Sequence, residues 1–140
     1  MLELFWDSSM DVQLQEMNSE HKRLIEIMNR LSLEFVQKFP RPSIKSTLEE
    51  LVKFTTKHFS HEEKELEAMQ YPEIETHKKL HAQLLSTLNK SLEDYKKGTD
   101  LDEKFFEFLH MWLKSHIRGL DVQYGKFYAS KSDSSLSSAS

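Results

Sequence analysis

A chain of 140 residues with a net charge of −4 suits a single domain, and it has no basic excess that would make nucleic acid its main partner. Three Gly, three Pro and no Cys favour helix over sheet and exclude disulfides, thiolate metal sites and a cysteine nucleophile. Residues 1–7 lack the features of a signal peptide, and no apolar run approaches the roughly 20 residues of a membrane helix, so we expect a cytoplasmic protein without membrane insertion.

Residues 1–17 show no long period, but their apolar side chains predict an arm that packs against the rest of the protein. Asn18 can cap a helix, and apolar residues then step by three and four, which predicts a helix over residues 18–38. His21 lies on the apolar stripe of this helix. The proline-containing segment 39–42 ends it.

The second predicted helix begins at Ser43, a possible cap, and ends before Pro72. In the middle of its apolar stripe stand His58 and Glu62. Because the two residues are four apart, they lie on one face of the helix. Two residues of metal-ligand type thus replace apolar ones at core positions.

The third predicted helix, residues 72–97, repeats this spacing with His77 and His81. Gly98 follows it and suits the left-handed conformation that ends many helices. A capping box is predicted at residues 99–102, where Asp takes the acid position.

The fourth predicted helix carries His116 and continues to Tyr124. Asp121 is five residues beyond His116, which is about 140° around an ideal helix and awkward for a shared site. Gly119 lies between them, so we predict a local widening of the helix of the π-bulge kind. The alternative for Gly119 is close packing against a neighbouring element.

The end of the chain differs in composition from the rest. Residues 130–140 are serine-rich and of low complexity, which predicts a disordered tail after a bundle domain of residues 1–129. Four long helices with short connections predict an all-α fold, an up-down-up-down four-helix bundle with an N-terminal arm.

The ligand-type residues on the four stripes form one set. A single histidine on a core stripe is most often an ordinary core residue. A buried carboxylate, however, is rare unless it is paired or bound to metal, because desolvating its charge costs several kcal/mol. Two carboxylates facing five imidazoles therefore predict two divalent metal ions. The predicted ligands are His21, His58, Glu62, His77, His81, His116 and Asp121.

Counting coordination positions predicts one vacancy at such a pair. Two octahedral ions that share an oxygen bridge offer twelve positions, of which the bridge fills two. Two carboxylates that each bridge both ions fill four, and five histidines fill five. Eleven of the twelve positions are then filled, and a small ligand could bind at the last.

In these motifs the chain resembles the hemerythrins, specifically the bacterial single-domain kind, from about Trp6 to Tyr124. The resemblance implies a non-haem, oxo- or hydroxo-bridged pair of iron ions that binds dioxygen reversibly at the iron with two histidines. The implied ligands are His77, His81 and His116 for one iron, His21 and His58 for the other, and Glu62 and Asp121 as bridges. The matching motifs are His21-Lys22-x-Leu24, His58-Phe59-x-x-Glu62-Glu63, Tyr71-Pro72, His77-x-x-x-His81 and Trp112-Leu113-x-x-His116-Ile117-x-x-x-Asp121-x-x-Tyr124.

The resemblance also implies an apolar dioxygen pocket beside the ligands. Such a pocket would slow the loss of dioxygen and the oxidation of iron, while the alternative interpretation is plain bundle core. The family usually has Asp-x-Gln-His before its first ligand, but here Glu20 precedes His21 and brings a charge close to that iron. The predicted pocket residues are Leu24, Phe59, Trp112 and Ile117.

Four further residues of ligand type are predicted to lie outside the site. His61 and His110 point away from their stripes and are expected at the surface. Glu63 and Glu65 are expected on a solvated face, with Glu65 as the reserve carboxylate because it lies seven residues from His58.

The leading hypothesis is oxygen storage or delivery to an oxygen-consuming enzyme, by a monomer or weak homo-oligomer that is not itself an enzyme. We find no acid beside the vacancy that would drive O–O cleavage. A sensor of dioxygen, redox state or nitric oxide would need a fused output domain, which we do not find in this sequence, or a ligand-dependent shift of the Trp6 arm. Two hypotheses stand beside these: a di-iron peroxidase or iron-oxidising enzyme, and a structural metal bundle that holds zinc.

Overall fold

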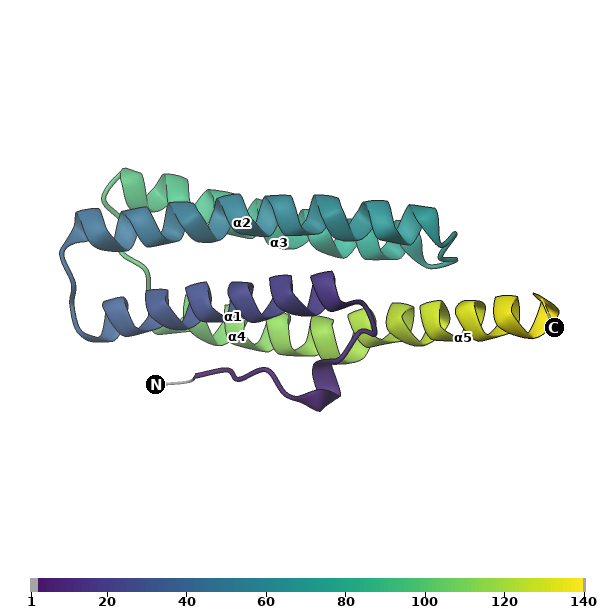
Figure 1. Ribbon diagram of the computed structural model, residues 1–140. Coiled ribbons are helices and arrows are strands. Elements are labelled where there is room, and N and C mark those ends of the chain that lie inside the picture. The colour runs from purple at the N-terminus through teal and green to yellow at the C-terminus, as the bar shows by residue number, and fades with distance from the viewer. Residues whose placement is uncertain (1–2, 140) are drawn as a thin grey trace.

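Four antiparallel helical rods form the predicted up-down-up-down four-helix bundle (Figure 1). The structure is a computed structural model that describes residues 3–139, with side chains to residue 131. In this part of the chain no helix is both long and apolar enough to cross a membrane. The helices are α1 Gln15–Val36, α2 Arg41–Ala68, α3 Ile74–Lys96, α4 Glu103–Ser115, the π-helical turn η2 His116–Asp121 and α5 Val122–Ala139.

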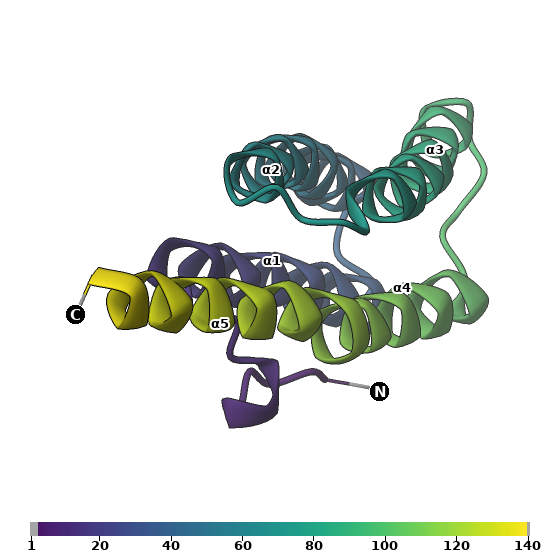
Figure 2. The ribbon, with the colours of Figure 1, turned by 90° about the vertical axis from the view of Figure 1, so that its right-hand side faces the viewer.

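The rods are arranged in two layers. Figure 2 shows α1 beside the α4–α5 rod in one layer and α2 beside α3 in the other. Because the connections at residues 37–40, 69–73 and 97–102 are short, consecutive helices are neighbours, and α2 packs against both α1 and α3. The α4–α5 rod is longer than the others and extends beyond the end of the bundle in Figure 1.

The beginnings of the helices differ from the predicted ones. Asn18 lies inside α1, where its side chain accepts a hydrogen bond from Val12 N–H at 3.0 Å and donates one to Asp11 at 2.9 Å. Asn18 is therefore not the cap of α1 but connects the arm to this helix by hydrogen bonds. Similarly, α2 begins at Arg41, two residues before the predicted cap Ser43.

At the connection between α3 and α4, one predicted terminus is confirmed and one is wrong. Gly98 ends α3 with a φ of 109°, and the next residue, Thr99, donates its N–H to the carbonyl of Asp94 at 2.9 Å. The cap of α4 is Asp102, whose side chain accepts from Phe105 N–H at 2.9 Å. The predicted capping box placed this role at Thr99.

The N-terminal arm packs against the bundle, as predicted, and contains a short 3₁₀ helix, η1 (Ser8–Met10). Asn29 of α1 holds its beginning, because its side chain accepts from Leu4 N–H at 3.1 Å and donates to the Leu4 carbonyl at 2.7 Å. Further along, the arm crosses α5 at Gly125. A Cβ at Gly125 would overlap the carbonyl of Val12, so this crossing requires glycine.

Two apolar clusters make up the core. The larger one runs through the bundle, and the smaller one lies where the arm, α1, α2 and α5 meet. The serine-rich segment, predicted to be disordered, continues α5 as helix to Ala139. No glycine or proline follows Gly125 to stop that helix. The buried members of the smaller cluster are Val12, Met17, Leu66, Met69 and Tyr124.

Candidate metal centre

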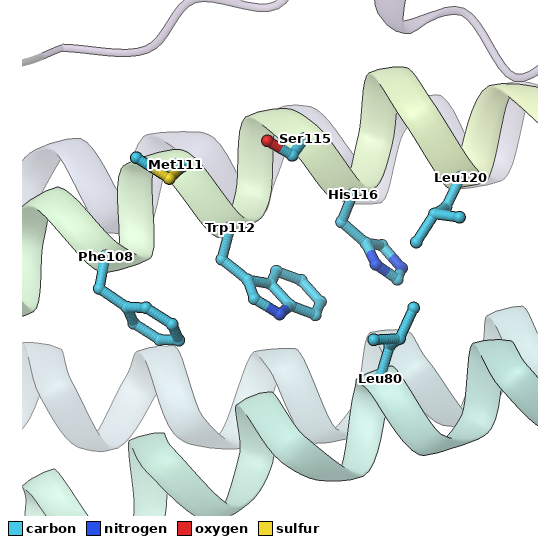
Figure 3. Close-up of a pocket in the computed structure, with 7 residues that line it drawn as sticks. All are labelled: Leu80, Phe108, Met111, Trp112, Ser115, His116 and Leu120. Carbon is cyan, nitrogen blue, oxygen red and sulfur yellow. The ribbon is translucent and has the colours of Figure 1, made fainter.

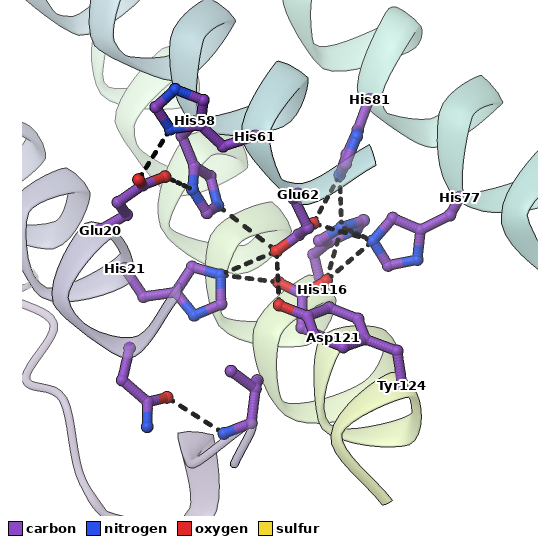
Figure 4. Close-up of polar contacts among 12 residues, drawn as sticks. Glu20, His21, His58, His61, Glu62, His77, His81, His116, Asp121 and Tyr124 are labelled. Carbon is purple, nitrogen blue, oxygen red and sulfur yellow. Dashed lines mark hydrogen bonds and ion pairs between the residues drawn. The ribbon is translucent and has the colours of Figure 1, made fainter. Parts of the chain in front are cut away.

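All seven predicted ligands meet in the interior of the bundle (Figure 4). They come from α1, α2, α3 and the π-helical turn η2, so every rod contributes. None of the seven is more than 4% exposed. We call two sets of them the three-histidine group (His77, His81 and His116) and the two-histidine group (His21 and His58).

Glu62 lies between the two groups and presents one carboxylate oxygen to each. Its Oε1 is 3.0 Å from the Nε2 atoms of His77 and His81. Its Oε2 is 3.2 Å from Nε2 of His21 and 3.5 Å from Nε2 of His58. A carboxylate in this position can bridge two ions, one in each group.

Asp121 repeats this arrangement from the opposite side of the site. Its Oδ1 is 2.9 Å from Nε2 of His77 and 3.1 Å from Nε2 of His116. Its Oδ2 is 3.0 Å from Nε2 of His21. Both carboxylates therefore have one oxygen directed at each group of histidines.

The π-helical turn brings His116 and Asp121 to the same side of their rod. In a π-helix the hydrogen bond joins residues five apart, so two side chains at that spacing approach one another. The predicted widening of the helix is confirmed, because η2 spans His116–Asp121. Gly119 is exposed, and a Cβ there would meet no neighbouring atom within 4 Å. The alternative of close packing at this glycine is wrong.

The inward-facing nitrogens of the three-histidine group are close together. Nε2 of His116 is 3.3 Å from Nε2 of His77 and 3.2 Å from Nε2 of His81. Neutral imidazoles can place only lone pairs or N–H groups there, and lone pairs directed at one point are what a cation binds. In addition, Oδ1 of Asp121 is buried beside Nε2 of His77 and Nε2 of His116, at 2.9 and 3.1 Å. These features fit metal ions between the side chains.

The charges of the site also call for a cation. Burial lowers the pKa of His21 and His77, but the hydrogen bonds and charges of Asp121 and Glu62 outweigh it. They raise the pKa of His21 to about 10 and that of His77 to about 9. In the metal-free protein, protons on these histidines therefore balance the carboxylates.

The two carboxyl groups show the reverse effect. Burial raises the pKa of Glu62, yet the hydrogen bond from His21 and the charge of His58 hold it well below its usual range. Burial and the charge of Glu62 likewise raise the pKa of Asp121, but His116 and other imidazoles hold it below its usual value. Both groups are thus carboxylates at neutral pH and available to a metal.

Tyr124, the last residue of the matching motifs, contacts the site directly. Its hydroxyl donates to Oε2 of Glu62 at 2.8 Å, and the residue is completely buried. Burial and the charges of Glu62 and Asp121 raise the pKa of this phenol well above its usual value. Tyr124 is therefore a protonated donor that holds one oxygen of Glu62.

Two glutamates bind the outer nitrogens of candidate ligands, and sequence reasoning missed both contacts. Glu63, predicted on a solvated face, accepts from Nδ1 of His81 at 2.9 Å. Glu20 lies next to His21 in sequence but contacts Nδ1 of His58 at 2.7 Å. Both contacts join different helices, so the spacing of residues along one helix carries no signal for them.

The second oxygen of Glu20 contacts His61, a residue predicted at the surface. Nδ1 of His61 is 2.9 Å from Oε2 of Glu20, and its side chain is 35% exposed. Burial raises the pKa of Glu20, but the hydrogen bonds and charges of His58 and His61 outweigh it and lower that pKa. Glu20 is thus an ionised link between a surface histidine and a buried one.

Apolar side chains surround the candidate ligands. Phe59 stacks on His81 with ring centroids 3.7 Å apart, and Trp112 stacks on His116 at 4.3 Å. Phe59, Leu24 and Ile117 are at most 3% exposed and belong to the larger apolar cluster. These three of the four predicted pocket residues are fully interior.

The fourth predicted pocket residue, Trp112, is only partly buried. It borders a surface hollow of about 440 Å³ between α3 and α4, which also reaches His116 (Figure 3). Met111, on the rim, is 68% exposed. Trp112 therefore lines this hollow together with one member of the three-histidine group, His116. The hollow is lined by Leu80, Phe108, Met111, Trp112, Ser115, His116 and Leu120.

A family model, related sequences and solved structures all match most of this chain. Residues 12–125 match the family described as the hemerythrin HHE cation binding domain. A bacteriohemerythrin of Pseudomonas aeruginosa (strain UCBPP-PA14) is 30% identical over 124 residues, which cover 89% of this chain and 80% of that protein. A myohemerythrin of Theromyzon tessulatum is 31% identical over 121 residues, covering 85% and 88%. A crystal structure of wild-type hemerythrin shares the fold, with a TM-score of 0.82 at 22% identity over 88% of this chain and 95% of that one.

Proposed function

This chain belongs to the hemerythrin family, and we propose that it binds dioxygen reversibly at a pair of non-haem iron ions, as an oxygen store or carrier. One observation carries the proposal: the two buried carboxylates each direct one oxygen at the three-histidine group and the other at the two-histidine group. This arrangement suits two ions that share both carboxylates.

The proposed ligands are divided unequally between the two ions. His77, His81 and His116 would hold one iron, and His21 and His58 the other, with Glu62 and Asp121 bridging. Bound iron supplies the electrons that dioxygen takes up and returns. The ion with two histidines would have one ligand fewer, so we propose that dioxygen binds on that side.

The side chains around the ligands would keep the site dry and ordered. Leu24, Phe59 and Ile117 exclude bulk water from the interior, and water promotes the irreversible oxidation of iron. Tyr124 holds Oε2 of Glu62 and keeps its proton. These features favour a binding protein over an enzyme, because the phenol is committed to a ligand and does not protonate the dioxygen.

A sensor is the second candidate function, and the N-terminal arm favours it. The arm's helix η1 lies against the π-helical turn η2, which carries two proposed ligands. Arg118 of that turn forms an ion pair with Asp7 of the arm at 3.0 Å. A change in the ligands of the turn could therefore move the arm and alter a partner-binding surface.

The test is iron content followed by spectroscopy. The reduced protein is measured by visible absorption under nitrogen, then in air, then under nitrogen again. We expect two irons per chain and a band that appears with air and fades when air is removed. Prompt and irreversible oxidation would instead favour the sensor or an enzyme. Folded protein that cannot be loaded with iron would contradict the proposal.

A further inference from the structure

Glu20 connects the surface of the protein to the two-histidine group. It lies on α1 and reaches across to α2, where its two oxygens bind two different histidines. Oε1 is 2.7 Å from Nδ1 of His58, and Oε2 is 2.9 Å from Nδ1 of His61. The exposed fraction of the side chains rises along this chain of contacts, from 1% for His58 to 15% for Glu20 and 35% for His61.

The carboxylate determines which nitrogen of His58 carries the proton. An ionised carboxylate can only accept hydrogen bonds, so Nδ1 of His58 must be the donor. In the neutral ring, Nε2 then has a lone pair, and this atom faces the interior, 3.5 Å from Oε2 of Glu62. By keeping the proton on Nδ1, Glu20 thus leaves the lone pair of Nε2 of His58 free to bind a metal ion.

The other member of the two-histidine group has no such support. Nδ1 of His21 is buried and has no hydrogen-bond partner. In the three-histidine group the corresponding role falls to Glu63 on His81, and the Glu63 side chain is 28% exposed. Within its group, His58 is therefore the histidine whose electron donation a carboxylate can strengthen.

We propose that Glu20 is a positioning residue that fixes the tautomer of His58 and strengthens its bond to the metal ion of the two-histidine group. His61 holds the second oxygen and keeps the carboxylate oriented toward His58. The inference rests on the proposed function, in which His58 is an iron ligand. A carboxylate on the outer nitrogen makes a histidine a stronger ligand, and removing such a partner commonly costs about 10- to 100-fold in metal affinity.

The test compares the affinity for iron of matched variants. Fe²⁺ alone is added under nitrogen to the iron-free full chain, in competition with a coloured chelator. E20Q keeps the size of the side chain and can still accept from His58, but it removes the charge. We expect the weaker of the two Fe²⁺ ions to bind E20Q about tenfold less tightly than the wild-type chain. E20D, which keeps the charge, should lie closer to the wild type.

E16Q is the matched control, because Glu16 lies one turn earlier on α1, close to Glu20 and His61. It removes the same charge without a hydrogen bond to His58, and its affinity for Fe²⁺ should stay within about twofold of the wild type. An E20Q chain that binds Fe²⁺ as tightly as the wild type would overturn the inference. A loss in E16Q as large as that in E20Q would do the same, because the effect would then be general electrostatics.

A measurement on the wild-type chain keeps the inference testable even if E20Q does not fold. Nitrogen NMR shifts of the iron-free protein, with the His58 signal assigned, report which ring nitrogen carries the proton. We expect the proton on Nδ1 in E16Q as in the wild type, and a signal from Nε2–H alone would overturn the inference. If the wild-type chain binds no Fe²⁺, the proposed function fails. If it binds two and E20Q binds them equally well, only the role of Glu20 fails.

Discussion

The two halves of the bundle use the same four rods in opposite ways. In the half that contains the connections 37–40 and 97–102, most interior positions are apolar, and residues such as Leu31, Leu48 and Leu109 are at most 2% exposed. In the other half, interior positions of the same rods carry five histidines and two carboxylates, none of which is more than 4% exposed. The interior side chains are therefore almost completely buried in both halves, but they are mostly apolar in one half and ionisable in the other.

The difference separates what packing can stabilise from what needs a cation. Apolar side chains gain free energy simply by leaving water, at about 25 cal/mol per Å². Carboxylates lose free energy on burial unless a positive charge lies beside them. The apolar half should consequently be stable without metal ions. The stability of the polar half should depend on protons or on metal ions that balance the buried carboxylates.

The largest expected effect is on metal binding in the polar half. The variant His58→Ala should remain a folded helical protein, because the apolar half is untouched, but it should lose one iron and dioxygen binding. Iron analysis and visible spectra measure both losses. His61→Ala is the control, since His61 is not a proposed ligand, and it should keep two irons per chain. Identical behaviour of the two variants would contradict the assignment of His58.

In the apolar half, Leu48→Ala should cost about 2–5 kcal/mol of the free energy of unfolding, because it leaves a cavity in a completely buried position. Its iron content should equal that of the wild type. Chemical denaturation of the iron-free chain measures the first quantity and iron analysis of the loaded chain the second. Loss of iron together with stability would show that the two halves are not independent.

A smaller effect is expected for Tyr124→Phe, which removes only the hydroxyl that donates to Glu62. A hydrogen bond to a charged group contributes about 1.5–3 kcal/mol, so the unfolding free energy should fall by that amount. Chemical denaturation of the iron-free chain measures the loss. The variant Tyr128→Phe is the control, because Tyr128 is 38% exposed and should tolerate the change. Equal stabilities of the two variants would argue against a structural role for the buried phenol.

The last expected effect is a pH dependence confined to the iron-free protein. The folded pKa values of His21 and His77, about 10 and about 9, lie above the ordinary value of 6.5. Protonation of these groups therefore contributes stability that is complete below pH 6.5 and is lost as the pH rises through 9 to 10. We expect the unfolding free energy of iron-free protein to fall by at least about 1 kcal/mol over this range.

The two carboxylates make the unfolding free energy fall at low pH, whereas the two histidines make it fall at high pH. Because the pKa values of Glu62 and Asp121 are lowered, their contribution is present above pH 4.5 and is lost as the pH falls further. Thermal unfolding from about pH 2 to 10, with and without iron, measures the loss of stability at both low and high pH. Bound iron replaces the protons on the histidines, so the loaded protein should lack the decline at high pH. An iron-free protein with constant stability from pH 6.5 to 10 would contradict this account.

Much of the fold and of the site could be predicted because both follow the period of a helix. The apolar stripes give the rods, and the polar residues on those stripes converge by the same geometry. The spacing of His116 and Asp121 even indicated the π-helical turn, since no regular α-helix brings both to one side.

What could not be predicted depends on which side chains meet across different rods. Asn18 has the chemistry of a cap, but it binds the arm instead, because the arm folds back over α1. In the sequence Glu63 looks solvated and Glu20 looks like a neighbour of His21, and only the packing of α1 and α3 against α2 brings them to His81 and His58. Such contacts depend on how the rods are rotated relative to one another, which the period of a single helix does not specify.

The π-helical turn has a consequence for everything beyond it in the fourth rod. One extra residue in a helix advances all later side chains by about 100° around the axis. Deleting Gly119 would restore an uninterrupted α-helix and rotate α5 back by that angle. Tyr124 would then turn away from Glu62, and Gly125 would no longer face Val12, where only a glycine fits. A single residue in the turn that carries His116 and Asp121 thus sets the rotation of α5 about its axis. That rotation in turn determines where the N-terminal arm packs against α5.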